Sequence, residues 1–228
     1  MTLNQIKSAI YALYLTNRYG FRMKSAPEAD GFVKQRLEYS ELLLSKLNID
    51  VEIVGREKID QGGQYLIVSN HRSIIDPLVV EIALKGKDIV SVWIAKKELF
   101  NSFFFGAFTR SARSILLDRE DSKQMGSFFK DVKENVAKGY SINVFPEGSR
   151  NQEDIALSEF KKGSEVIAMK NRLPILPIYI RTNSHEVLME SIRHNTKDLR
   201  VVAEIGDLID YKDRSSTLEE SYRRRFNI

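Results

Sequence analysis

One of the three histidines lies in a sequence that suits acid–base chemistry. His71 belongs to the stretch SNHRSIIDP, residues 69–77, which follows an apolar run and ends in an aspartate and a proline. Asp76 comes five positions after His71, and on a continuous helix the two side chains would point about 140° apart. A turn between a strand and a helix would instead let the carboxylate fold back onto the imidazole. The carboxylate would then fix the tautomer and leave the other ring nitrogen free to take a proton.

The same residues also have a purely structural interpretation. Asp76 can cap a helix that begins near Pro77, because aspartate is a preferred residue at that position. His71 would then be a structural histidine of the loop. The local sequence alone leaves both interpretations open.

Positively charged side chains follow several of the predicted strands. They are Lys96, Lys97, Arg119 and Arg150. Arg150 closes the stretch VFPEGSR, in which Glu147 precedes Gly148, a residue type that permits unusual backbone angles. A planar guanidinium is well suited to phosphate. A single surface cation is usually just solvated, but this grouping beyond strand ends predicts a site for a phosphorylated ligand.

Strand-like and helix-like segments alternate from residue 50 onward. The predicted strands are 51–55, 65–70, 89–96, 114–118, 140–145, 175–181 and 200–209, and the predicted helices of this part are 77–86, 121–138 and 159–171. This alternation predicts an α/β fold with a largely parallel central sheet flanked by helices. Ligands bind beyond the carboxyl ends of strands in such sheets. The motifs SNH, LDR and FPEGSR each follow a predicted strand, so we expect them to meet at one edge.

Two further helices are predicted before the sheet, over residues 3–22 and 31–47. We therefore expect an N-terminal amphipathic helical hairpin at residues 1–48 and an α/β domain at 49–228. The hairpin can pack on the core of the domain, or it can lie in a lipid interface with basic residues at the headgroups. Its first helix carries basic residues and no acidic one, and its apolar run is far shorter than the roughly 20 residues of a membrane-spanning helix.

Composition and missing motifs exclude several classes of protein. The balance of 35 Lys+Arg against 31 Asp+Glu is mildly basic, and the absence of cysteine excludes disulfides and thiolate metal sites while fitting a reducing compartment. HEVLM at 185–189 lacks the second histidine of a zinc protease, and no glycine-rich phosphate loop follows a strand. The phenylalanines cluster at 99–108 rather than alternating with basic residues, which argues against nucleic acid. These phenylalanines can belong to the core or form an exposed apolar surface for an acyl chain or lipid.

Four sequence blocks resemble the glycerolipid acyltransferase family, of which the PlsC-type 1-acyl-glycerol-3-phosphate acyltransferases are members. NHRSIID is similar to the first block, a histidine and an aspartate separated by four residues, and SILLDR to the second, G-x-x-F-x-x-R. FPEGSR is similar to the third block and LPILPIYI to the fourth, a proline-bearing strand. The blocks occur in the right order over about residues 70–180. One departure is Arg113, which stands where the second block usually begins with glycine.

The resemblance implies an activity and a set of site residues. A fatty acyl group would pass from acyl-CoA or acyl-carrier protein to the hydroxyl of 1-acyl-glycerol-3-phosphate, giving phosphatidic acid for phospholipid biosynthesis. His71 would be the general base and Asp76 its partner, and amides of the loop could hold the oxyanion. The residues implied to bind the acceptor are Lys96, Arg119, Glu147, Gly148 and Arg150. Pro174 and Pro177 would shape the acyl-donor side.

The partners implied are a lysophospholipid or glycerol-phosphate acceptor, the acyl donor as a co-substrate, and a membrane surface. No metal, no cofactor and no nucleic acid are expected. The protein would be peripheral, on the cytoplasmic face of the membrane. Two alternatives remain, namely transfer to another acceptor, such as glycerol 3-phosphate or a lyso-aminolipid, and a non-catalytic membrane-surface adaptor.

Overall fold

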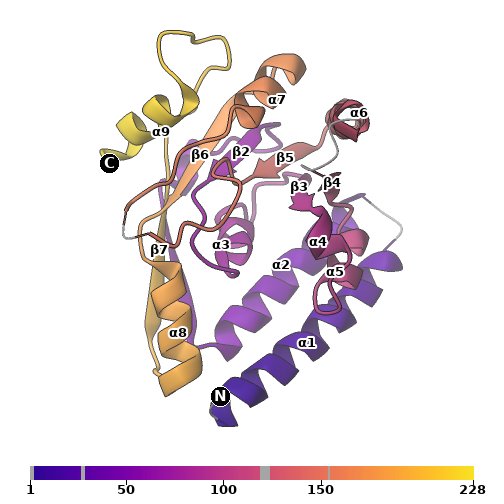
Figure 1. Cartoon of the computed structure of the whole chain (residues 1–228), viewed down its shortest axis with the longest axis vertical. Helices are drawn as coiled ribbons and strands as arrows, with labels where there is room; N and C mark the ends of the chain where they lie inside the picture. The colour runs from indigo at the N-terminus through magenta and orange to yellow at the C-terminus, as the bar shows by residue number, and fades with distance from the viewer. Residues whose placement is uncertain (1–2, 27–28, 119–123, 154) are drawn as a thin grey trace.

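A seven-stranded sheet forms the centre of the protein, in the order β1-β7-β6-β2-β5-β3-β4 (Figure 1). The computed structural model describes residues 3–26, 29–118, 124–153 and 155–228. The strands are β1 (Ile49–Val54), β2 (Leu66–Ser69), β3 (Ser91–Lys96), β4 (Ile115–Leu117), β5 (Ser141–Val144), β6 (Ile175–Ile180) and β7 (Leu199–Ile205). The five strands from β6 to β4 are parallel, whereas β7 is antiparallel to β6 and parallel to β1. The predicted α/β fold with a largely parallel sheet is confirmed.

Helices cover both faces of this sheet (Figure 1). They are α1 (Leu3–Lys24), α2 (Ala29–Lys46), α3 (Asp76–Ala83), α4 (Lys97–Phe100), α5 (Gly106–Ser111), α6 (Met125–Ala137), α7 (Gly163–Asn171), α8 (Ser184–His194) and α9 (Leu218–Phe226), with a 3-10 turn at Arg56–Lys58. The sequence predicted the segments that became α1, α2, α3, α6 and α7. It missed the short α4 and α5 in the phenylalanine-rich stretch, as well as α8 and α9.

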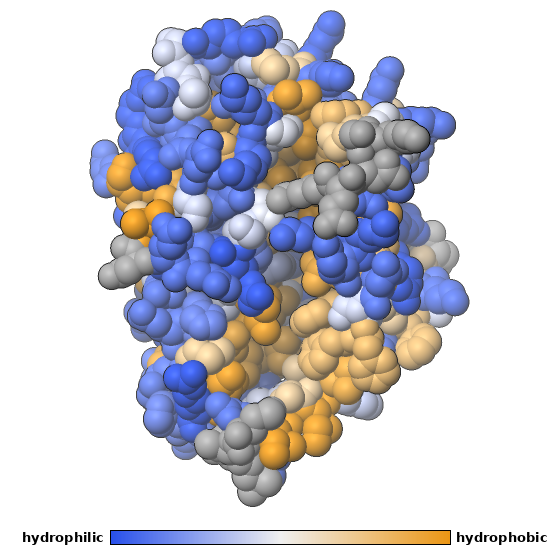
Figure 2. Space-filling view, in the orientation of Figure 1, coloured by the Kyte–Doolittle hydropathy of each residue, from blue (hydrophilic) through white to orange (hydrophobic). Residues whose placement is uncertain are grey.

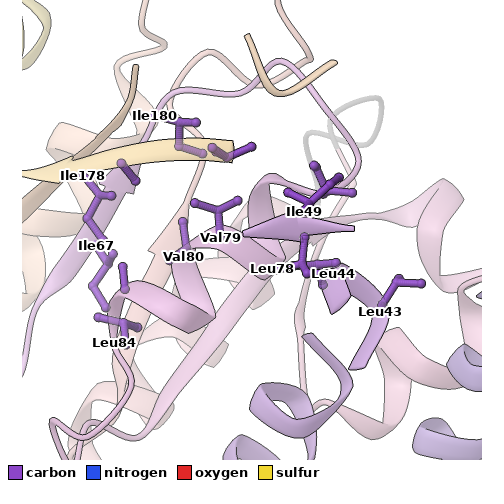
Figure 3. Close-up of a cluster of buried hydrophobic side chains, with 14 of the residues drawn as sticks. Leu43, Leu44, Ile49, Ile67, Leu78, Val79, Val80, Leu84, Ile178 and Ile180 are labelled. Atoms are coloured by element: carbon purple, nitrogen blue, oxygen red, sulfur yellow. The ribbon is translucent and has the colours of Figure 1, made fainter. Parts of the chain in front are cut away.

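The central strand β2 sends its side chains alternately into two buried clusters. Leu66 and Val68 belong to one cluster and Ile67 to the other, as the two-residue period of a strand requires. On the Ile67 side, Val79 and Val80 of α3 pack toward the sheet (Figure 3). Burying a side chain of this size stabilises the fold by roughly 1.5–3 kcal/mol relative to exposure. These contacts fix α3, and with it the position of Asp76 at the first turn of that helix.

The two N-terminal helices pack on the same core as the sheet. Leu15 and Tyr19 of α1 are buried in the cluster that contains Ile67. Leu43 and Leu44 of α2 belong to the same cluster (Figure 3). Helix α1 crosses α5 closely at Gly20, where a Cβ atom would come within 3.0 Å of the backbone nitrogen of Phe108. The inner faces of both helices therefore belong to the hydrophobic core.

The outer face of α1 is apolar and exposed. Ile6, Ile10, Tyr14 and Phe21 repeat at helical spacing and remain open to solvent. Phe103, between α4 and α5, is 89% exposed. Figure 2 shows an apolar surface over α1 and the neighbouring α4 and α5. Within the described residues, no helix has both the length and the apolar character that a membrane span requires.

Candidate active site

His71 and Asp76 lie against each other beyond the carboxyl end of β2. The Nδ1 atom of His71 is 2.9 Å from Oδ2 of Asp76. A carboxylate can only accept a hydrogen bond, so the neutral ring carries its proton on Nδ1 and keeps the lone pair on Nε2. The side chain of His71 is 18% exposed and that of Asp76 is 1% exposed. The predicted turn thus orients the imidazole, and the ring remains partly open to solvent.

Asp76 holds the loop as well as the ring. Its Oδ2 accepts hydrogen bonds from the backbone N–H groups of Arg72 and Ser73, both at 2.6 Å, and its Oδ1 accepts one from the Ser184 hydroxyl at 2.5 Å. The carboxylate faces back toward the preceding loop, and the residue before it, Ile75, is the N-cap of α3, without a side-chain bond. The alternative in which Asp76 merely caps the helix is therefore wrong.

Glu147, in the loop after β5, joins that loop to the His71 loop. One carboxylate oxygen accepts the backbone N–H of His71 at 2.6 Å, and the other accepts the backbone N–H of Ser158 at 2.7 Å. The backbone N–H of Asn151 in turn donates to the carbonyl of His71 at 2.7 Å. Burial raises the pKa of the Glu147 carboxyl above its ordinary value of 4.5, and the two N–H bonds oppose this shift. Both oxygens of Glu147 are thus occupied by the protein itself.

The loop amides differ in one respect from the sequence-based expectation. The N–H groups of His71, Arg72 and Ser73 all donate to the carboxylates of Asp76 or Glu147. They cannot also stabilise an oxyanion, because each N–H has one proton to donate. An oxyanion formed near His71 must therefore be held by other groups.

The face of the His71 ring rests on Phe145, the first residue of FPEGSR. The two rings are stacked, with centroids 3.9 Å apart and planes 8° from parallel. Gly148 closes the turn that places Phe145, since its φ is 76° and its N–H donates to the Phe145 carbonyl at 3.0 Å. That φ lies in the left-handed region, which glycine adopts without steric cost. The structure therefore gives Gly148 a backbone role in the turn.

The predicted cations are less firmly held. Lys96 ends β3 and pairs in register with Leu117 of β4, so it lies at the same edge as the His71 loop. Arg150 is exposed and immediately precedes Asn151, which bonds to His71. Within the described ranges neither Lys96 nor Arg150 forms an ion pair, whereas Lys97 binds Asp118 at 2.7 Å. Arg119, also predicted for the site, lies outside the described residues.

Of the two prolines of the fourth block, Pro174 lies just before β6 and Pro177 lies within it. The Pro174 carbonyl accepts the N–H of Leu66 at the amino end of β2, opposite the end that leads to His71. Pro177 is paired with Val68 inside the sheet. Their expected role on the acyl-donor side stays a prediction.

Sequence reasoning missed three polar residues that support the histidine loop. Ser184 reaches Asp76 from the first turn of α8. Asn70 binds both the N–H and the carbonyl of Ile180 through its side-chain amide, and so continues the pairing of β2 with β6. Tyr222 of α9 donates to the carbonyl of Ile178 and accepts the N–H of Asn70. The sequence did contain one signal for α8. Asn183 is followed three residues later by a glutamate, a pattern that is typical of the start of a helix.

Arg113, the departure from the second block, adopts the backbone conformation of a glycine. Its φ is 56°, in the left-handed region where glycine is favoured. Its guanidinium carbon lies 4.9 Å from the ring centroid of Phe32, which is a cation–π arrangement. The backbone at this position keeps a shape suited to the usual glycine, although the side chain differs.

Comparisons with known proteins agree with these blocks. The Acyltransferase family profile matches residues 50–181. A 1-acyl-sn-glycerol-3-phosphate acyltransferase of Helicobacter pylori is 36% identical over 156 residues, which is 68% of this chain and 60% of that protein. The human 1-acyl-sn-glycerol-3-phosphate acyltransferase alpha is 33% identical over 131 residues, which is 57% of this chain and 45% of that protein. The chain thus spans less than two thirds of the length of these relatives.

A solved structure shares the fold. It is the crystal structure of the 1-acyl-sn-glycerophosphate (LPA) acyltransferase PlsC from Thermotoga maritima, with a TM-score of 0.72 and 23% sequence identity. The alignment covers 98% of this chain and 92% of that one, so it includes the N-terminal helix pair. The profile match extends over more than half of the chain and contains His71, Asp76 and Glu147. This protein belongs to the Acyltransferase family.

Proposed function

We propose that the protein transfers a fatty acyl group from an acyl thioester to the hydroxyl of 1-acyl-glycerol-3-phosphate, producing phosphatidic acid. The observation that carries this proposal is the 2.9 Å contact between His71 Nδ1 and Asp76 Oδ2, in a ring that is partly open to solvent. The relatives from Helicobacter pylori and human are named for the same reaction, which supports this proposal. The donor is acyl-CoA or acyl-carrier protein, used as a co-substrate.

The reaction uses His71 as a general base. Nε2 takes the proton of the acceptor hydroxyl while the hydroxyl oxygen attacks the thioester carbonyl carbon. Asp76 stabilises the imidazolium that forms. When the tetrahedral intermediate collapses, the carbon–sulfur bond breaks, and the proton on Nε2 passes to the leaving thiolate. The ring returns to its starting state, and neither a metal nor a covalent acyl-enzyme is needed.

The acceptor phosphate is bound by the cations at the same edge of the sheet. Lys96 and Arg150 supply positive charge from the ends of β3 and β5, and the family resemblance adds Arg119. Glu147 acts through the backbone, because both of its oxygens accept N–H groups of the loops. Its contribution to acceptor binding is therefore to hold the loop that carries His71.

The decisive experiment measures acyl transfer by the wild type and by His71→Ala. Positioned general bases contribute about 10²–10⁴-fold, so we expect kcat to fall by at least about 10²-fold in the variant. His194→Ala is the control, since His194 is exposed on α8. Acceptors should include lysophosphatidate, glycerol 3-phosphate and a lyso-aminolipid, each with acyl-CoA and with acyl-carrier protein, with the products identified by mass spectrometry. Normal turnover by His71→Ala would exclude the proposed mechanism.

We also propose that the protein binds the cytoplasmic face of a membrane through the outer face of α1. The support is the exposed stripe of Ile10, Tyr14 and Phe21, flanked by Lys7 and Arg18 and continued by the apolar surface near α5 (Figure 2). Apolar burial combined with attraction to anionic lipid is the way interfacial helices bind.

Vesicle binding tests this surface separately from catalysis. Ile10→Glu combined with Phe21→Glu should weaken co-sedimentation with anionic vesicles, because both changes place charge on the stripe. Leu42→Glu is the matched control, since Leu42 is an exposed apolar residue of α2 outside the stripe. Equal binding by the double variant and the control would reject the surface. Vesicle binding without acyl transfer to any acceptor would instead favour the adaptor alternative.

A further inference from the structure

A buried ion pair joins the N-terminal helices to the helix that carries Asp76. Arg36 of α2 and Glu81 of α3 have side chains that are 2% and 5% exposed, and Arg36 Nε lies 3.0 Å from Glu81 Oε1. That contact is an ion pair rather than a well-directed hydrogen bond. The guanidinium also donates to the carbonyl of Ser91 at 2.9 Å and to its hydroxyl at 3.1 Å. Burying two charges is costly, and a buried ion pair often adds no net stability. A role in positioning is therefore an alternative to a role in stability.

Glu81 has a further partner that leads toward the candidate active site. Its Oε1 accepts the indole N–H of Trp93 at 2.8 Å. The Trp93 ring packs against Phe145, with centroids 5.0 Å apart and planes tilted by 31°. Phe145 in turn stacks on the His71 ring at 3.9 Å. A continuous series of contacts therefore runs from Arg36 to the imidazole.

Helix α3 thus provides two carboxylates that act on the same ring from different directions. Asp76, at its first turn, binds the ring edge at Nδ1, and Glu81, near its last turn, supports the ring face through Trp93 and Phe145. We propose that Glu81, held by Arg36, is a positioning residue for His71, so that helix α2 is part of the catalytic apparatus. This inference rests on the proposed role of His71 as the general base.

The physical need for a second support follows from the geometry of a single hydrogen bond. A ring held only at Nδ1 can still tilt about the line from Nδ1 to Asp76, and Nε2 on the far side of the ring moves with it. The stacked Phe145 prevents this tilt, provided that Phe145 is itself held in place by Trp93. Misplacing a reacting group by about 1 Å can reduce the rate by about 10²-fold.

Two substitutions interrupt the series at different contacts. Glu81→Gln removes the charge that balances Arg36, and Trp93→Phe removes the indole N–H while leaving the ion pair in place. In both variants we expect kcat to fall about 10-fold with little change in KM for the acceptor, because the base is displaced while the cations are not. Trp93→Phe keeps the test available if Glu81→Gln does not fold.

Two control variants separate positioning from general destabilisation. Glu41→Gln breaks the exposed contact between Glu41 of α2 and Lys85, which lies just after α3, and should leave kcat unchanged. Leu44→Ala truncates a buried residue of α2 and lowers stability without touching the series. At a temperature where both are folded, Leu44→Ala should retain more turnover than Glu81→Gln.

A second measurement does not depend on acyl transfer. Diethylpyrocarbonate modifies accessible imidazoles, and the exposed His185 and His194 serve as internal references in the same molecule. We expect faster modification of His71 in Glu81→Gln and Trp93→Phe, with the references unchanged. Trp93 is the sole tryptophan, so its fluorescence should also report a changed environment in Glu81→Gln.

The outcomes distinguish this inference from the proposed function. Slower turnover together with faster His71 modification, in both variants and in neither control, supports positioning. Turnover and modification equal to those of Leu44→Ala at matched stability overturn it. If the wild type transfers no acyl group to any acceptor, the proposed function fails, while the modification rates still decide whether Glu81 holds the ring.

Discussion

A buried carboxylate follows each of the strands β2 and β5, Asp76 in the first turn of α3 and Glu147 in the loop after β5, and the two are bound in different ways. Asp76 contacts the His71 ring, two backbone N–H groups and the Ser184 hydroxyl. Glu147 accepts a backbone N–H group at each oxygen, and the Ser158 side chain adds a further hydrogen bond. Asp76 therefore acts on the imidazole directly, whereas Glu147 fixes the backbone conformation of the loops around it.

The difference predicts how each carboxylate tolerates loss of its charge. A hydroxyl can donate or accept a hydrogen bond, so Ser184 can adjust to a new partner on Asp76. A backbone N–H can only donate, so the N–H groups of His71 and Ser158 cannot adjust to a new partner on Glu147. Replacing each acid by its amide should therefore affect mainly the rate at Asp76 and mainly the stability at Glu147.

Asp76→Asn should give the largest loss of activity. Its amide oxygen can keep the bonds to the His71 ring and to the N–H groups of Arg72 and Ser73, while its NH₂ donates to Ser184, so the fold survives. The negative charge that stabilises the imidazolium is lost, and we expect kcat to fall by about 10²-fold or more with little change in acceptor KM. Steady-state kinetics and thermal unfolding measure the two effects. A stable variant with wild-type kcat would show that the charge of Asp76 does not serve catalysis.

Glu147→Gln should be the more damaging change for stability. Its NH₂ group must face the N–H of either His71 or Ser158, which leaves a buried donor without an acceptor. Such a loss costs about 2–3 kcal/mol, and the displaced loop should lower kcat about 10-fold. Denaturant unfolding and kinetics test both. Glu159→Gln is the control, because Glu159 lies in the following segment and is 82% exposed. If Glu147→Gln were as stable as this control, the proposed difference between Asp76 and Glu147 would be wrong.

Ser184→Ala sharpens the role of Asp76 with a smaller effect. Removing the hydroxyl leaves Oδ1 of a buried carboxylate without its donor, at a cost of about 1–2 kcal/mol, and should lower kcat only a few-fold because the contact with His71 remains. Ser191→Ala is the matched control on α8, since Ser191 donates to the neutral carbonyl of Leu47. The control should retain wild-type kcat. An equal loss of kcat in both variants would mean that α8 affects the site through packing alone.

The sequence predicted the parts of this arrangement that depend on local pattern. Apolar runs gave the strands, and polar residues at their ends gave the edge where His71 and Glu147 meet. The contact of His71 with Asp76, 2.9 Å in the structure, was expected because a turn was predicted between a strand and Pro77. The short α4 and α5 were missed because phenylalanines spaced around a short helix show neither period clearly.

Contacts between distant segments could not be predicted from the sequence. Ser184 lies 108 positions from Asp76, and Trp93 bonds to a glutamate of another element, so neither contact has a local signature. Glu147 was expected to bind the acceptor because its motif resembles a substrate-binding block. Whether a carboxylate faces a ligand or backbone N–H groups depends on how two loops meet, and this is a property of the folded chain.

The pH dependence of stability tests the burial of Glu147 with the smallest expected effect. Burial raises the pKa of this carboxyl in the folded protein above the ordinary value of 4.5. Between pH 4.5 and the higher folded-state pKa, the folded protein keeps a proton that the unfolded protein releases. The contribution of Glu147 to the free energy of unfolding is therefore complete below pH 4.5 and falls as pH rises through the folded-state pKa. Subtracting the free energy of Glu147→Gln at each pH isolates this contribution from the other carboxylates. A difference that increased with pH would mean that the two N–H bonds outweigh burial, and that the ionised form of Glu147 is the one the fold stabilises.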